Sequence, residues 1–240
     1  MQWLHAVYLI LIGMGAGFVQ RVSGFGLGIF AMMFLPYFTP TPVAASISTL
    51  FSCVTSTYNA IRYRKEIAYK TAIPMVCAAL VAIPIAVYFS AVVSARIFQW
   101  LLGGVLILLS IYFLFFNQRI KLKPNLTNGL LAGVVGGTLN GLFSTGGPPV
   151  VLYLSSALKS TGAYFATIQF YFCFTNIYAT AMRAVNGILT KDALLYAAIG
   201  LVGCMVGDTL GKQVFHKLNA EKLKKIIYIG MIISGIVMFF

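Results

Sequence analysis

Residues 17–28 of the chain are Gly17-Phe18-Val19-Gln20-Arg21-Val22-Ser23-Gly24-Phe25-Gly26-Leu27-Gly28. Apolar segments precede and follow this run, so Arg21 lies where only apolar side chains would otherwise be expected. An ionisable group at that depth costs several kcal/mol and marks a candidate functional site. A second glycine-rich run, residues 133–149, has the same character without the arginine. We expect the two runs to form the two sides of one binding site.

The composition excludes a soluble globular domain. Of the 240 residues, 60% are hydrophobic and 9% are charged, whereas a soluble domain has about 25% charged residues. The long, continuous apolar runs predict an all-α integral membrane protein. The 17 Lys and Arg against 4 Asp and Glu lie mostly in short loops, where orientation and anionic lipid headgroups explain them without nucleic acid. The four cysteines predict buried thiols, and neither a metal nor a cofactor is expected.

The apolar segments occur twice in the same order, which indicates an internal duplication within one membrane domain, residues 1–240. The repeats cover about residues 1–118 and 126–240. Residues 53–58 and 173–178 share Cys, Thr and Tyr at an offset of 120 positions. The predicted segments are 3–22, 25–38, 43–61, 71–89 and 97–116 in the first half, and 129–143, 149–158, 163–182, 193–211 and 226–240 in the second.

The segments that follow the glycine runs are too short to cross a bilayer as ordinary helices. Residues 25–38 would rise about 21 Å and residues 149–158 about 15 Å, whereas the hydrocarbon core is about 30 Å thick. We therefore expect each half to begin with a glycine-broken re-entrant helix pair, which turns near mid-membrane and leaves by the face it entered. Three transmembrane helices complete each half. Irregular backbone at that depth needs protein or water around it.

The distribution of basic residues favours this topology. If both pairs are re-entrant, one face receives 13 lysines and arginines and the other receives Arg96, Arg183 and Lys191, while Arg21 stays inside. The positive-inside rule makes the richer face cytoplasmic. The two halves are then inverted repeats, as in secondary transporters with alternating access. The 13 residues are Arg62, Arg64, Lys65, Lys70, Arg119, Lys121, Lys123, Lys159, Lys212, Lys217, Lys222, Lys224 and Lys225.

The residues around the two breaks predict a site for a small oxyanion. A helix that begins at a glycine break presents backbone N–H groups that have no intrahelical partner and carry positive partial charge. Proline suits such a helix start, and glycine lets a ligand approach the backbone. Arg21 adds a permanent cation able to bind an oxyanion through two hydrogen bonds. The predicted substrate-binding residues are Gln20, Arg21, Ser23, Gly24, Phe25, Gly26, Asn140, Gly141, Ser144, Thr145, Gly146 and Gly147.

The polar and small residues of the apolar segments also have structural explanations. Close helix packing is the alternative role of each glycine. Gln169 and Asn176 are candidates to line a pathway, but we expect hydrogen bonds between helices. Asp208 is a candidate for ion coupling, although an ion pair with Lys212, four residues later, is the simpler expectation. Arg183 borders an external loop, and we assign it no function.

The motif Gly-Phe-x-Gln-x-x-Ser-Gly-Phe-Gly at residues 17–26, and the glycine-rich run that ends in Gly-Gly-Pro-Pro at residue 149, resemble the sulfite exporter TauE/SafE family of membrane transporters. The similarity extends over nearly the whole chain. It implies a transporter that moves sulfite, or a small organosulfonate such as sulfoacetate, across the bacterial inner membrane, usually outward. The second motif departs from this symmetry because it has no cation that matches Arg21.

Together these observations predict a multi-pass secondary transporter, with a small anionic substrate and membrane lipids as partners and a homodimer as one assembly the sequence allows. One alternative is an importer of thiosulfate or another sulfur compound that uses Cys53 or Cys173, and another is an anion channel. An enzyme is not expected, since the membrane-depth residues contain neither paired carboxylates nor a His/Asp cluster.

Overall fold

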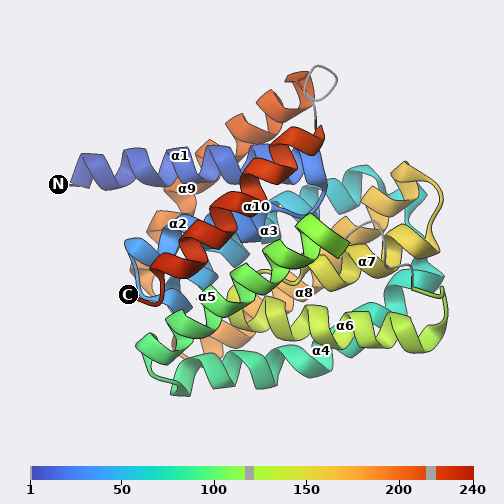
Figure 1. Ribbon diagram of the computed structural model, residues 1–240, viewed down its shortest axis with the longest axis horizontal. Helices are drawn as coiled ribbons and strands as arrows, with labels where there is room; N and C mark the ends of the chain where they lie inside the picture. Colours follow the sequence, from blue (N-terminus) through green and yellow to red (C-terminus); the bar gives the residue numbers. More distant parts are fainter. Residues whose placement is uncertain (1, 117–121, 215–219) are drawn as a thin grey trace.

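The computed structural model describes residues 2–116, 122–214 and 220–240, and within them the chain is helical without strands (Figure 1). This confirms the all-helical prediction. Two short 3-10 turns, η1 (Leu35–Tyr37) and η2 (Arg64–Glu66), and a π turn, Tyr112–Phe116, extend the helices that precede them. The helices are α1 (Gln2–Ser23), α2 (Leu27–Phe34), α3 (Thr41–Arg62), α4 (Tyr69–Val92), α5 (Ala95–Ile111), α6 (Leu126–Phe143), α7 (Gly147–Ala157), α8 (Thr161–Val185), α9 (Lys191–Val214) and α10 (Ala220–Val237).

Five helices of the described residues are long and apolar enough to cross a membrane: Trp3–Ser23, Tyr69–Val92, Ala95–Phe115, Leu126–Phe143 and Lys191–Gln213. α3 and α8 are as long but more polar, and many of their Ser, Thr, Asn and Gln side chains are buried. Buried polar groups in a membrane protein need partners within the protein. The chain is therefore a multi-pass membrane protein whose polar helices lie inside it.

Three of the 13 basic residues that the sequence assigns to one membrane face, Arg119, Lys121 and Lys217, fall outside the described residues.

Each glycine run interrupts a helical hairpin. The first break, residues 24–26, separates α1 from α2, and the second break, residues 144–146, separates α6 from α7. In Figure 1, α1 runs away from the N terminus and α2 turns back, whereas α6 and α7 make the same turn in the opposite direction. α2 has 8 residues and α7 has 11, so both are much shorter than a membrane crossing. α1, with 22 residues, rises about 33 Å, and the depth of the breaks in the membrane stays a prediction.

Local sequence explains where two of the long helices, α6 and α8, begin. Asn125 Oδ1 accepts a hydrogen bond from the Asn128 N–H at the start of α6 (2.8 Å). Ser160 Oγ caps α8 in the same way, three residues before Ala163 (3.3 Å). Such caps satisfy backbone donors that have no intrahelical partner. The capped ends are near the sequence-predicted boundaries, which differ from the structure by a few residues.

Small residues bring two pairs of helices into backbone contact. On α6, a Cβ added to Gly137 would lie 2.6 Å from Ala79 Cα of α4, and a Cβ on Gly141 would lie 2.7 Å from Ala86 Cβ. α1 approaches α9 equally closely, since a Cβ on Gly17 would lie 2.9 Å from Cys204 Cα. Interfaces of this kind let membrane helices pack without a hydrophobic driving force. The glycines that line these interfaces therefore serve close helix packing, the alternative role expected from the sequence.

Helices of the first half pack mainly on helices of the second half. α1 of the first half packs on α9 of the second, and α6 of the second half packs on α4 of the first. α3 packs against α8, and α5 packs against α10. The two halves are thus interleaved rather than side by side, and the breaks lie where α3 and α8 meet the two hairpins.

Candidate functional site

Side chains from the end of α1 hold the first break in shape. Ser23 Oγ accepts a hydrogen bond from the Gly26 N–H (3.1 Å) and donates one to the α1 backbone (2.7 Å). Gln20 Oε1 accepts from the N–H of Leu27, the first residue of α2 (3.2 Å). Gly24 has a φ of +83°, a conformation that glycine adopts at little cost. The prediction that the first N–H groups of α2 are unpaired is therefore wrong for Gly26 and Leu27, because the motif's own side chains satisfy them.

The second break is built differently. Ser144 ends α6 with a φ of +59°, and its N–H bonds to the Asn140 carbonyl (3.0 Å). Ser48 of α3 donates a hydrogen bond to Ser144 Oγ (3.2 Å). The hydroxyl of Thr145 is buried and has no hydrogen-bond partner in the part of the chain that the structure describes. α7 begins at Gly147 and continues with two prolines, which have no N–H, so its first turn offers few backbone donors.

The two breaks lie against each other. A Cβ on Gly28, at the start of α2, would overlap the carbonyl oxygen of Ser144. A Cβ on Gly147, at the start of α7, would lie 2.9 Å from the ring of Phe25. Residues more than 100 positions apart thus meet. At Gly28 the neighbour is backbone, so a side chain there would separate the breaks.

Polar residues of α8 connect both breaks to the rest of the core. Gln169 Nε2 donates to the Gly24 carbonyl (2.9 Å), and Gln20 Nε2 lies 3.4 Å from Gln169 Oε1. Asn176 accepts from Asn140 Nδ2 (3.0 Å), and its own amide donates to a serine of α3 (2.8 Å). The expectation that Gln169 and Asn176 form hydrogen bonds between helices is confirmed.

Arg183 is buried, although its position beside a loop predicted no function for it. Its side chain is 1% exposed. Its Nη2 donates to the carbonyls of Asn140 (3.2 Å) and Gly141 (2.8 Å), and its Nη1 donates to the Ala45 carbonyl (3.0 Å) and to the Thr49 hydroxyl. These α6 carbonyls lie at the end of the helix where the dipole is negative. The second motif has no cation of its own, but α8 supplies one to its carbonyls.

The spacing along α8 could have revealed this arginine. Gln169, Asn176 and Arg183 are seven residues apart, about two helical turns, so they share one face of α8. That face contacts the first break at one end and the second break at the other. Seven-residue spacing of polar side chains in an apolar segment is therefore the sequence signal for this buried polar face.

Arg21 lies between α1 and α9. Its aliphatic stem packs against Gly211 of α9, where an added Cβ would lie 2.8 Å from Arg21 Cβ. Asp208 is also on α9, and Arg21, Arg62 and Lys212 are the cations near enough to act on it. The expected ion pair of Asp208 with Lys212 stays a prediction. Substrate contact by Arg21, and ion coupling by Asp208, stay predictions.

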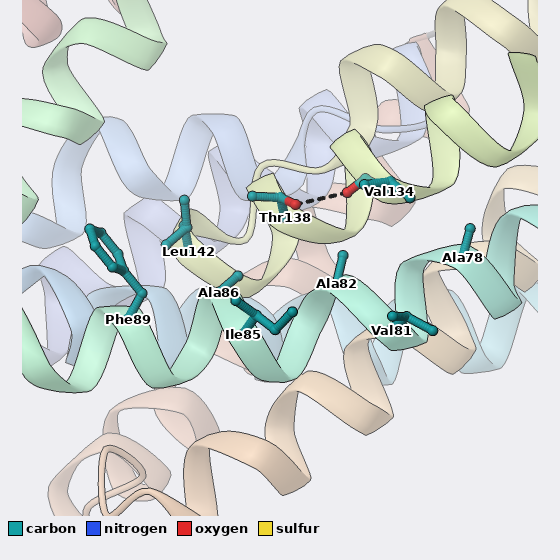
Figure 2. A pocket seen from close by; sticks show the side chains of 9 residues that line it. All are labelled: Ala78, Val81, Ala82, Ile85, Ala86, Phe89, Val134, Thr138 and Leu142. Carbon is teal, nitrogen blue, oxygen red and sulfur yellow. Dashed lines mark hydrogen bonds between the residues drawn. The ribbon is translucent and has the colours of Figure 1, made fainter.

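The described cavities do not offer an open binding chamber at the breaks. A groove of about 380 Å³ between α4 and α6 is lined by nine residues, eight of them apolar (Figure 2). Its one hydroxyl, on Thr138, donates to the Val134 carbonyl (2.9 Å), so the groove has no free group for an oxyanion. A cavity of about 20 Å³ touches Ser23, Phe25 and Gly26, which is room for about one water.

Two comparisons with known proteins give a match for this chain. The family model described as sulfite exporter TauE/SafE matches residues 9–238. A protein of Cupriavidus necator named "Probable sulfite/organosulfonate exporter TauE" is 26% identical over 211 residues, which cover 85% of this chain and 81% of the relative. No solved structure matches the chain.

Proposed function

The chain belongs to the sulfite exporter TauE/SafE family, and we propose that it is a secondary transporter that exports sulfite or a small organosulfonate across the bacterial inner membrane. The name of its relative supports an anionic sulfur substrate. The multi-pass helical fold supports transport rather than catalysis. Membrane lipids surround the protein, and a homodimer is an assembly that we keep as a proposal.

The observation that carries this proposal is the contact between the two breaks. Gly28 of one hairpin and Ser144 of the other lie in backbone contact, and the hairpins turn in opposite directions (Figure 1). The exchange of packing partners, α1 with α9 and α6 with α4, is the pattern that inverted repeats would produce. Broken helices that meet between inverted repeats are a recurrent substrate site in secondary transporters, where one repeat moves against the other.

We propose that the substrate binds at these breaks and displaces the side chains that now accept hydrogen bonds from their N–H groups. Gln20 and Ser23 occupy the N–H groups at the start of α2, and an oxyanion is a stronger acceptor than an amide or hydroxyl oxygen. Release of these side chains would present the N–H groups to the substrate as the breaks separate. The proposed binding residues are Gln20, Arg21, Ser23, Gly24, Phe25, Gly26, Asn140, Gly141, Ser144, Thr145, Gly146 and Gly147.

Transport by the purified protein tests the proposal. Proteoliposomes loaded with unlabelled sulfite or sulfoacetate should accumulate the labelled anion by counterflow, with a rate that saturates. Arg21→Gln should abolish binding and uptake, whereas Arg96→Gln should retain both, since Arg96 lies over the Trp100 ring on the surface of α5. Absence of uptake of either anion by the wild-type protein would contradict the proposal.

Two alternatives have different outcomes in the same assay. An anion channel would give flux that neither saturates nor exchanges with substrate inside. A thiosulfate importer is supported by one contact, because the Thr57 hydroxyl lies 3.4 Å from Cys173 Sγ and Cys53 is one turn before Thr57. Counterflow of thiosulfate but not of sulfite, lost on replacement of both cysteines, would favour that function.

A further inference from the structure

Arg183 is a buried cation without a carboxylate partner in the described chain. The protein has four acidic residues. Glu66 and Asp192 are exposed, Asp208 lies near Arg21, and the side chain of Glu221 is outside the described residues. Desolvating a charge costs several kcal/mol unless it is compensated. Backbone carbonyls solvate the guanidinium, but they leave its net charge in place.

Two buried polar atoms lack partners in the described part of the chain, one in Arg183 and one in the second break. The guanidinium of arginine has five N–H donors, and the Nη groups of Arg183 account for its hydrogen bonds to α3 and α6. Its Nε has no partner among the described residues, nor does the hydroxyl of Thr145, a residue that is 1% exposed. Buried polar groups are almost always satisfied, and exceptions require an explanation such as a bound water or ion.

The Nη bonds fix the plane of the guanidinium. Nη2 donates to two α6 carbonyls, at 3.2 Å from Asn140 and 2.8 Å from Gly141, and Nη1 donates to an α3 carbonyl. A group fixed in this way loses little entropy when its remaining donor is used. The free donor therefore belongs to a rigid cation beside residues already proposed to bind substrate.

We propose that Arg183 binds the oxyanion from the second half of the chain, donating a charge-assisted hydrogen bond from Nε while the anion neutralises the buried charge. This inference rests on the proposed function and adds a residue to its site. Arg183 is then the cation that the second half adds to the proposed site. Anions with at least two oxygens and a full negative charge, such as sulfite and sulfonates, fit this arrangement.

Binding to purified variants tests the inference. Sulfite and sulfoacetate are titrated into wild type, Arg183→Lys, Arg183→Gln and the surface control Arg96→Gln, by calorimetry, and the melting temperature is measured with and without ligand. We expect Arg183→Gln to bind about 10- to 100-fold more weakly, the range for loss of a charge-assisted hydrogen bond. Arg183→Lys should be intermediate because it keeps the charge but not the Nε donor, and Arg96→Gln should bind as wild type does.

A purely structural role gives a different result. If Arg183 only stabilises the end of α6, Arg183→Gln will melt at a lower temperature but will bind sulfite with wild-type affinity, and the inference is overturned. If Arg183→Gln does not fold, NMR of wild-type protein with ¹⁵N-labelled arginine decides. The Nε resonance that disappears in Arg183→Lys should shift when sulfite binds, and no shift at saturation would overturn the inference.

The same titrations separate this inference from the proposed function. A wild-type protein that binds neither sulfite nor sulfoacetate refutes the function itself. A wild-type protein that binds, together with an Arg183→Gln variant that binds equally well, refutes only the role of Arg183.

Discussion

Gly28 is the residue whose replacement most directly tests whether the two breaks touch. In Gly28→Ala the new methyl group overlaps the Ser144 carbonyl oxygen, so the breaks must separate by about 1 Å or more to restore a normal contact. The obstacle is backbone, which cannot rotate away as a side chain can. Overpacking of this kind costs about 1–3 kcal/mol, and the helix propensity of alanine returns at most about 1 kcal/mol. We expect a net loss of about 2 kcal/mol.

Gly104→Ala on α5 is the matched control, because a Cβ there meets nothing within 4 Å. It should be neutral or more stable by up to about 1 kcal/mol. Thermal melting in detergent measures both variants, and at about 2–4 °C per kcal/mol for a chain of this size, Gly28→Ala should melt about 4–8 °C below wild type. Its counterflow rate should fall as well, since the breaks no longer close. A Gly28→Ala variant that melts at or above the wild-type temperature refutes the contact.

Three further variants test the hydrogen bonds around the breaks and the role of the cysteines. Gln169→Leu leaves a buried carbonyl of the first break unsatisfied and should destabilise the protein by about 1–3 kcal/mol, seen as a lower melting temperature. Asn176→Leu unpairs polar groups on both α3 and α6 and should destabilise it at least as much in the same measurement; an unchanged melt would show that these hydrogen bonds contribute nothing. The double variant Cys53→Ser, Cys173→Ser should keep full sulfite counterflow, and loss of transport would indicate a thiol role.

The positions of the breaks followed from the sequence, but their hydrogen bonding did not. The glycines of residues 24–26 and 144–146 interrupt long apolar segments, and the helices stop there. The sequence supplies donors and acceptors at such a place, but it does not say whether they bind a ligand or each other. In this structure Gln20 and Ser23 accept hydrogen bonds from N–H groups that follow them by seven and three residues in their own chain.

The role of Arg183 depended on tertiary structure. α8 continues to Val185, three residues beyond its predicted end, and an arginine near the end of a membrane segment usually extends its charge to the interface. Its burial follows from carbonyls on α3 and α6, which lie 42 to 138 residues away in the chain. Contacts at that separation leave no local pattern, apart from the spacing on α8.

The glycines have two roles, helix packing and contact between the breaks, and their spacing in the sequence partly separates the two. Gly133, Gly137 and Gly141 recur every four residues and face α4, as expected for a packing stripe. Gly28 and Gly147 follow no such period and face the opposite break. A periodic set of glycines therefore indicates a helix interface, while the others indicate the site where the halves meet.

The pairing of α1 with α9 has a consequence for how the protein is made. α1 ends at Ser23 and α9 begins at Lys191, 168 residues later, so at about 5–20 residues per second the ribosome needs roughly 10 to 30 s to supply the partner. During that time the glycine face of α1 has only lipid, or the insertion machinery, against it. Biogenesis must therefore tolerate an unfinished first helix, and a nascent chain that stops before α9 should be a substrate for membrane quality control.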